Sequence, residues 1–295
     1  MRLKNEKFLA TASLLAALFL VPGCLMPRLP GSVKVEKNIE YARVASGPLL
    51  LDLYTPKQLG KKLPVIVWLF GGGWKMGSKD FCPIAYMAAS NVAIVSINYR
   101  LSGSAPYPAQ IFDCKGAVRW LRANADRYHL DADHIGVFGA SAGGHLAALL
   151  GTTAGNAELE GDVGGNTNYS STVQAVCAFY PPTDLDLLVT NPASRNAANT
   201  MVGKLLGGSL NEHLALAARA SPLRFVSRDS APFFLLHGEK DSLVPVQQSE
   251  LLYAALKKAG VEAQLVIVPG KGHGIIAPPA AAQLIYQFFD RHLKT

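Results

Sequence analysis

The stretch IGVFGASAGGHLAALL, residues Ile135 to Leu150, combines an apolar strand, a sharp turn and an alanine-rich helix. Glycines at positions 139 and 143 flank Ser141 in the pattern G-x-S-x-G. In a strand–turn–helix of this kind, strained backbone exposes the serine hydroxyl above the sheet, and the helix N-terminus directs free N–H groups toward the group that the serine attacks. The stretch therefore predicts a nucleophile elbow with Ser141 as nucleophile.

Apolar strands alternate with helical stretches along the rest of the chain. Continuous runs such as VIVWLF (residues 65–70) and AVCAFY (residues 175–180) are typical of strands buried on both faces of a sheet. This alternation predicts one α/β domain over residues 33–295, with a mostly parallel central sheet covered by helices on both faces. Residues 153–172 and 184–230 interrupt the rhythm, and we expect them to form a small inserted cap that walls the acyl pocket.

Composition favours a globular enzyme. Of 295 residues, 49% are hydrophobic and only 17% are charged, which excludes a disordered chain and allows a sizeable core. The net charge of +7 comes from scattered basic residues, with no long basic run and no nucleic-acid-binding motif. We therefore interpret the basic residues as a solvated surface and expect no nucleic-acid partner.

Residues 1–24 are expected to be a targeting segment rather than part of the fold. Three basic residues precede an apolar run from Phe8 to Val21, which is too short to span a bilayer comfortably. The following Val-Pro-Gly-Cys resembles a bacterial lipoprotein signal, although Pro22 departs from the residue usual at its position. The expectation is export, with a lipidated Cys24 attaching the protein to a membrane and residues 25–32 as a tether. The alternative is ordinary cleavage, which gives a periplasmic or secreted protein.

Three further cysteines are present, Cys82, Cys114 and Cys177. Cys114 lies in a helical pattern and Cys177 in an apolar run, so both are expected to be small core residues. An odd count gives no disulfide framework, although one bridge remains an alternative in an oxidising compartment. No Cys or His spacing indicates a metal site, and we expect neither metal nor cofactor.

A nucleophilic serine needs a base and an acid that orients it, and in a parallel sheet both lie on loops after the strands. His273 follows the last strand in GKGHG, where a flexible loop would bring its imidazole over Ser141, whereas His237 ends a strand and could line the site or lie in the core. Asp241, in HGEKDSLVP, is the expected acid because the order Ser, Asp, His accompanies this elbow. Asp184 is its rival and is better interpreted as a turn or cap-anchoring carboxylate.

Gly71-Gly72-Gly73 follows a buried strand directly. Glycines there let the main chain approach a ligand with its N–H groups free. We expect the N–H groups of Gly72, Gly73 and Ala142 to form an oxyanion hole, in which each donor contributes about 3 kcal/mol to transition-state stabilisation.

Together these motifs resemble one family. They are similar to the motifs of α/β-hydrolase esterases of the hormone-sensitive-lipase-like type, closest to the acetyl and feruloyl esterase branch. The motifs are GGGW (71–74), NYRLS (98–102), GASAGGHLAALLG (139–151), YPPTDL (180–185), HGEKDSLVP and GKGHG. The resemblance implies the α/β-hydrolase fold with Ser141, Asp241 and His273 as catalytic residues. One departure is Phe70, which stands where the family usually has a histidine that helps to hold the oxyanion loop. An Arg100–Asp113 pair is expected to be structural.

The expected function is hydrolysis of short-chain carboxylic esters through an acyl-enzyme, and the resemblance points to deacetylation of xylan or similar carbohydrate esters. Two alternatives stay open within enzymes, an arylformamidase-type amide hydrolase and a related peptidase. A non-catalytic binding module on a hydrolase scaffold is a further alternative. Such modules usually lose a triad member, and this chain keeps all three.

Overall fold

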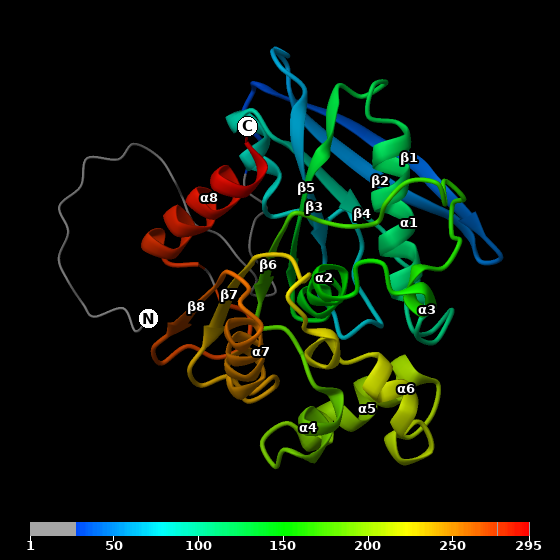
Figure 1. Ribbon diagram of the computed structural model, residues 1–295, viewed down its shortest axis with the longest axis vertical. Coiled ribbons are helices and arrows are strands. Elements are labelled where there is room, and N and C mark those ends of the chain that lie inside the picture. Colours follow the sequence, from blue (N-terminus) through cyan, green and yellow to red (C-terminus); the bar gives the residue numbers. More distant parts are fainter. Residues whose placement is uncertain (1–27, 276, 295) are drawn as a thin grey trace.

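Within residues 28–275 and 277–294, the part of the chain that the computed structural model describes, eight strands form one sheet in the order β1-β2-β4-β3-β5-β6-β7-β8 (Figure 1). Strands β4, β3, β5, β6, β7 and β8 are parallel, whereas β2 is antiparallel to both β1 and β4. The mostly parallel sheet is thereby confirmed. The strands are β1 (Val33–Val44), β2 (Gly47–Pro56), β3 (Leu63–Leu69), β4 (Ala93–Ile97), β5 (Leu130–Ala140), β6 (Ala175–Phe179), β7 (Phe233–Gly238) and β8 (Ala263–Val268).

Helices cover both faces of this sheet, and the alternation of side chains along each strand explains why. In β3, Val65 and Val67 pack into the core shared with α1 (Ala109–Ala123), α2 (Ala142–Thr152) and α7 (Gln247–Lys258). The intervening Ile66 and Trp68 pack into a second core with the 3₁₀ helix η1 (Ala85–Ser90) and α8 (Pro279–Leu293). Successive side chains of a strand point to opposite faces, so a continuously apolar strand supplies both cores.

Helix α8 shows how the sequence directs one of these layers. Proline at position 279 occupies the first turn, where no N–H partner is required. Ala281, Ile285, Phe288 and Phe289 are buried at helical spacing. This stripe fixes the face that α8 presents to the sheet, while the opposite face stays in solvent.

A group of short helices lies beyond the sheet, at the bottom of Figure 1. All of them lie within residues 184–230, which the sequence predicts to be a cap. At the start of the group, Asp184 Oδ1 accepts a hydrogen bond from the N–H of Leu187 at 3.1 Å. This is the capping role expected for Asp184. The elements are α4 (Leu185–Thr190), α5 (Arg195–Leu206), η2 (Leu210–Glu212), α6 (Leu214–Arg219) and η3 (Pro222–Phe225).

The other predicted cap segment, residues 153–172, packs along α1. It contains α3 (Ala157–Glu160), which lies beside α1 in Figure 1. Glu160 accepts hydrogen bonds from Lys115 at 2.6 Å and Arg119 at 3.3 Å, two cations on α1 that are almost fully buried. These bonds hold the segment along α1, and an ion pair of 3.3 Å between Glu158 of α3 and Arg219 of α6 joins it to the group of short helices. That the segment walls the acyl pocket stays a prediction.

The three described cysteines, Cys82, Cys114 and Cys177, are all buried and unpaired. Cys114 and Cys177 thus pack as the core residues that the sequence predicts. No helix in the described ranges is long and apolar enough to cross a membrane. The predicted lipidation site Cys24 lies outside the described residues.

Candidate active site

Ser141 occupies a strained turn between β5 and α2. Its backbone has φ 55° and ψ −121°, a conformation that costs a non-glycine residue free energy and persists only where the surroundings enforce it. The N–H of Ser141 donates to the carbonyl of Phe179 at the end of β6, at 2.9 Å. A Cβ on Gly143 would lie 2.0 Å from the carbonyl oxygen of Leu69, so only glycine lets α2 start this close to β3. The neighbouring strands therefore hold the turn in place.

The side chains of Ser141, His273 and Asp241 form one hydrogen-bonded chain. His273 Nε2 lies 3.0 Å from Ser141 Oγ, and its Nδ1 lies 2.7 Å from Asp241 Oδ2. The three residues follow β5, β8 and β7, whose carboxyl ends lie at the same edge of the sheet. A serine, a base and an orienting acid at these distances have the geometry required for nucleophilic attack on a carbonyl carbon.

The Asp241 carboxylate is buried but ionised. Burial raises its pKa, but hydrogen bonds from His237, His273 and the N–H of Val244 more than offset burial and hold the pKa well below the ordinary value. Asp241 Oδ1 also accepts from the N–H of Leu243 at 3.0 Å. A carboxylate fixed on both oxygens can hold the Nδ1–H of His273 and stabilise the imidazolium.

His237 belongs to the support of this site and not to its reacting groups. It is fully buried, with Nε2 2.7 Å from the carbonyl of Val244 and Nδ1 2.7 Å from Ser249 Oγ. Its Nε2 also lies 3.3 Å from Asp241 Oδ2. His237 therefore fixes the turn that carries Asp241. In the described part of the chain, no group of three or more His, Cys, Asp or Glu residues is arranged to hold a metal ion.

The turn after β3 presents backbone donors near Ser141. Gly72 and Gly73 have φ of 116° and 58°, and the Gly72 carbonyl accepts from the N–H groups of Lys75 and Met76, both at 3.2 Å. A Cβ on the preceding Gly71 would lie 3.3 Å from the Cβ of Ser141, which places the turn against the elbow. Within the described ranges, the N–H groups of Gly72 and Gly73 have no acceptor in the protein. They are available to an anionic oxygen.

Phe70 holds this turn without the histidine usual in the family. Its ring stacks on Tyr99 with centroids 4.3 Å apart and planes 11° apart. The Tyr99 hydroxyl donates to the Phe70 carbonyl at 2.8 Å. Arg100, the next residue, forms the expected pair with buried Asp113, at 2.6 Å between Nη2 and Oδ1. Aromatic packing and a backbone hydrogen bond thus anchor the start of the glycine turn.

His145 is a functional candidate whose role the sequence did not reveal. It is fully buried on α2 and connects the glycine turn to the cap. Trp74 Nε1–H donates to His145 Nδ1 at 3.1 Å, so Nε2 carries the proton and donates to the Ala220 carbonyl at 2.6 Å. Burial lowers the pKa of His145 from 6.5 to about 4, and the bond to Ala220 offsets this only in part. The imidazole is therefore neutral at physiological pH.

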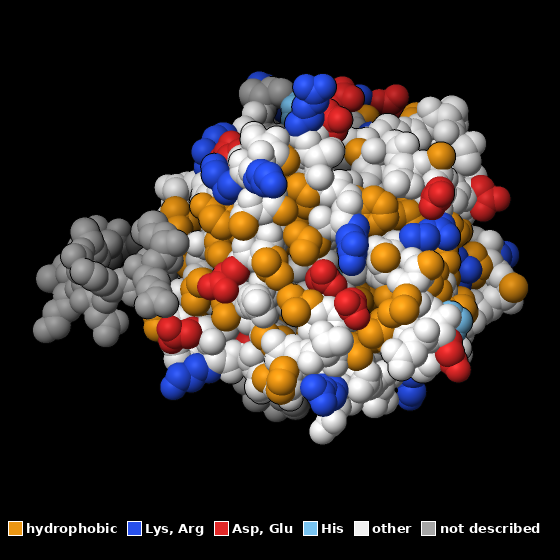
Figure 2. Space-filling model, turned by 60° about the horizontal axis from the view of Figure 1, so that its bottom comes forward, with side chains coloured by type: hydrophobic (Ala, Val, Ile, Leu, Met, Phe, Trp, Pro, Cys, Tyr) orange, Lys and Arg blue, Asp and Glu red, His pale blue; other side chains and the backbone are white. Residues whose placement is uncertain are grey.

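The cap also contacts the glycine turn directly. A Cβ on Gly73 would lie 2.7 Å from Sδ of Met201, a half-buried residue on α5. Met76, in the same turn, and Leu214, at the start of α6, are among the most exposed large apolar side chains. Figure 2, which brings this side of the molecule forward, shows apolar side chains spread across the face between scattered charges. Exposed apolar side chains thus lie both in the glycine turn and on the cap.

The sheet, the elbow and the Ser–His–Asp chain define the class, an α/β-hydrolase. The BD-FAE family model matches residues 51–256, which include Ser141 and Asp241 and stop before His273. The chain belongs to the BD-FAE family.

Relatives and solved structures agree with this assignment. The chain is 30% identical to Esterase LipC of Mycobacterium tuberculosis (strain ATCC 25618 / H37Rv) over 256 residues, which cover 84% of this chain and 63% of LipC. It thus spans less than two thirds of that relative. A truncated carbohydrate esterase from gut microbiota superposes with a TM-score of 0.77 at 29% identity, covering 89% of this chain and 97% of that one. An acetyl ester-xyloside bifunctional hydrolase from Caldicellulosiruptor lactoaceticus gives 0.70 at 26% identity, covering 90% and 95%.

Proposed function

We propose that this protein is a serine carboxylesterase that hydrolyses short-chain acyl esters, with Ser141 as nucleophile, His273 as base and Asp241 as orienting acid. The observation that carries the proposal is the continuous hydrogen-bonded chain from Ser141 Oγ through His273 to Asp241, at 3.0 and 2.7 Å. Esterases among the relatives and structural neighbours support the same reaction class.

In the proposed mechanism, His273 Nε2 takes the proton of Ser141 Oγ as this oxygen attacks the acyl carbon. The carbonyl oxygen becomes an oxyanion, which accepts hydrogen bonds from the N–H groups of Gly72, Gly73 and Ala142. His273 then gives its proton to the departing alcohol oxygen. Water, deprotonated by the same imidazole, attacks the acyl-enzyme and releases the acid. Asp241 stays ionised throughout and stabilises each imidazolium.

Contacts around the glycine turn support short acyl groups. Met201 packs against Gly73, next to the proposed oxyanion donors, and we propose that its side chain limits the length of the acyl group. For the alcohol part, the carbohydrate esterase and the acetyl ester-xyloside hydrolase that the chain resembles favour an acetylated sugar. We therefore propose acetylated carbohydrate, such as acetylated xylan, as substrate class.

A substrate panel tests this proposal. Wild type and Ser141→Ala are compared on p-nitrophenyl esters from acetyl to long-chain acyl groups, on acetylated xylan, on methyl ferulate and on N-formylkynurenine. We expect the wild type to turn over acetyl esters fastest and the variant to lose activity by about 10⁶-fold, as loss of such a nucleophile does elsewhere. Equal rates for the two proteins would refute the role of Ser141. Preference for N-formylkynurenine would favour the arylformamidase alternative.

For location, we propose export and attachment to a membrane through lipid on Cys24, a residue outside the described part of the chain. The support is the basic and apolar sequence before Cys24. Membrane fractions of cells that express wild type or Cys24→Ala would be compared by immunoblot. Equal membrane association of the two proteins would contradict lipidation at this residue.

A further inference from the structure

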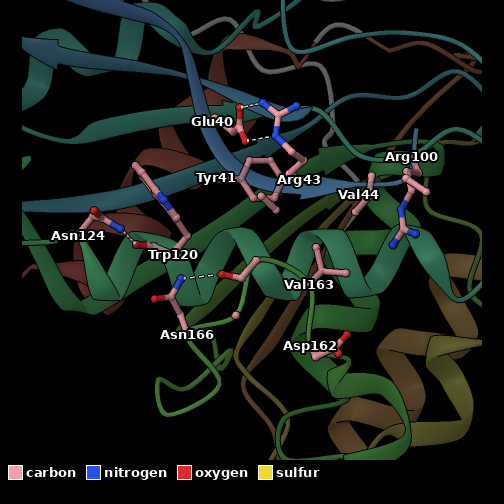
Figure 3. Close-up of a pocket in the computed structure, with 14 residues that line it drawn as sticks. Glu40, Tyr41, Arg43, Val44, Arg100, Trp120, Asn124, Asp162, Val163 and Asn166 are labelled. Atoms are coloured by element: carbon pink, nitrogen blue, oxygen red, sulfur yellow. Dashed lines mark hydrogen bonds and ion pairs between the residues drawn. The ribbon is translucent and has the colours of Figure 1, made fainter. Parts of the chain in front are cut away.

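An open groove runs along α1, on the side of the molecule where α1 faces β1. It encloses about 860 Å³ and is lined by residues 40–44 of β1 with Ala45, by Trp120 of α1 with the following Asn124, and by the turn 162–166 (Figure 3). This turn packs closely on the strand, since a Cβ on Gly164 would lie 2.9 Å from the carbonyl oxygen of Tyr41. We call this feature the α1 groove. None of the proposed catalytic residues lines it.

Arg100, at one end of the α1 groove, is connected to the glycine turn through its neighbours in the chain. Arg100 lines that end and follows Tyr99, whose hydroxyl binds the Phe70 carbonyl before the glycine turn. Two residues later, the N–H of Ser102 donates to the carbonyl of Trp74 at 2.8 Å. The groove extends from Arg100 to Trp120 and Asn124, at the C-terminal end of α1. A chain-like ligand that continues past Arg100 would approach the glycine turn.

The charges in the α1 groove balance, since Arg43 and Arg100 stand against Glu40 and Asp162, and both arginines are paired. Arg43 binds both carboxylate oxygens of Glu40, at 3.0 and 2.6 Å, above the groove in Figure 3. Arg100 binds both oxygens of buried Asp113 at 2.6 to 3.0 Å. With both arginines paired, the groove offers little to a phosphate chain or an acidic peptide, whose binding depends on available cations.

The remaining groups in the α1 groove suit hydroxyl-rich, uncharged rings. Trp120 is half-buried and projects from α1 toward β1 in Figure 3, which leaves part of an aromatic surface accessible. The Asn124 and Asn166 amide nitrogens donate to backbone carbonyls at 2.9 and 3.0 Å, and their amide oxygens remain acceptors. Hydroxyl groups can donate to such oxygens, while the apolar face of a sugar ring can lie on an indole.

We propose that the α1 groove binds the neutral sugar backbone of an esterified polysaccharide, with Trp120 packed against a sugar ring. The groove would hold the polymer while an acyl group on it reaches Ser141. The role of this binding in substrate recognition rests on the proposed esterase function. Binding of the sugar in the groove does not itself require catalysis.

Tryptophan fluorescence tests binding directly in the unmodified chain. The protein has three tryptophans, of which Trp68 and Trp74 are 0% and 1% exposed, so acrylamide should quench mainly Trp120. We expect xylohexaose or cellohexaose to protect the fluorescence from acrylamide. The proposal would be overturned if neither sugar protected the fluorescence from quenching. It would also be overturned if single-stranded DNA protected the fluorescence and the sugars did not. This outcome is independent of whether the protein hydrolyses esters.

Kinetics of Trp120→Ala and Trp120→Phe separate binding of the polymer from the chemical step. We expect Trp120→Ala to raise KM for acetylated xylan by about tenfold, the effect of losing one aromatic contact, with p-nitrophenyl acetate turnover unchanged. Trp120→Phe should recover part of the loss. Tyr286→Ala, which removes a half-buried aromatic ring from α8 on the other face of the sheet, is the matched control and should leave both substrates unaffected. Equal losses on both substrates would overturn the proposal, because a general folding defect lowers both alike.

Discussion

Replacing His145 with glutamine should remove a defined part of the acid sensitivity of the fold. The pKa of His145 falls from 6.5 in the unfolded chain to about 4 in the buried site. Between these values the unfolded chain binds a proton at this residue and the folded chain does not. The free energy of unfolding therefore falls as the pH is lowered from 6.5 to 4, by about 3 kcal/mol at ~1.36 kcal/mol per pKa unit. It falls no further from this source below pH 4.

Urea unfolding at several pH values between 4 and 7, followed by circular dichroism, measures how the free energy of unfolding depends on pH. Every other titrating group is common to both proteins, so the difference between wild type and His145→Gln isolates one imidazole. The variant should lose about 3 kcal/mol less than wild type on acidification, whatever its stability at pH 7. Thr152→Val, at a buried residue of the same helix that does not titrate, is the control and should keep the wild-type dependence. Identical pH dependence in wild type and His145→Gln would refute the reasoning.

Three further perturbations follow from the site and its support. Gly73→Ala places a side chain at a backbone φ of 58° and against Met201, which should displace the N–H of residue 73. Loss of this oxyanion donor should lower kcat for p-nitrophenyl acetate by about 10²-fold. An unchanged kcat would show that this N–H does not contact the oxyanion. Asp241→Asn should lower kcat by about 10⁴-fold with little change in KM, since it leaves His273 without its anionic partner; a loss confined to KM would exclude this role. Glu160→Gln removes the carboxylate that pairs with two buried cations. It should lower the free energy of unfolding in urea by about 3 kcal/mol and leave ester turnover intact. A decrease below about 1 kcal/mol would mean that the cations find other partners.

The sequence predicted most of the fold because local patterns determine it. The apolar runs at 65–70 and 175–180, predicted to be buried strands, correspond to β3 and β6, since a continuous apolar run is a local signal. The strand before Ser141 begins at Leu130, earlier than its apolar run, because Leu130 pairs with Leu63 of β3. Pairing with a distant strand leaves no local signal at that end.

The site was predictable where a motif follows a strand, and less so where it depends on distant contacts. Ser141, Asp241 and His273 each follow a strand in a recognisable motif, and the structure places their side chains within hydrogen-bonding distance. The position of segment 153–172 depends on cations 41 to 45 residues away on α1. His145 offered one signal, the single titratable side chain in a mostly apolar helix, but its partners lie 71 and 75 residues away.

The double hydrogen bonding of His145 has a kinetic consequence. One imidazole holds both Trp74, beside the glycine turn, and Ala220, at the end of α6. Swinging the cap aside would break a 2.6 Å bond and leave buried polar groups unpaired, at a cost of about 1–3 kcal/mol each. We therefore expect the cap to act as a fixed wall and not as a lid that an oil–water interface opens. Turnover of a soluble ester should rise smoothly through the concentration at which micelles form, without interfacial activation and without a lag.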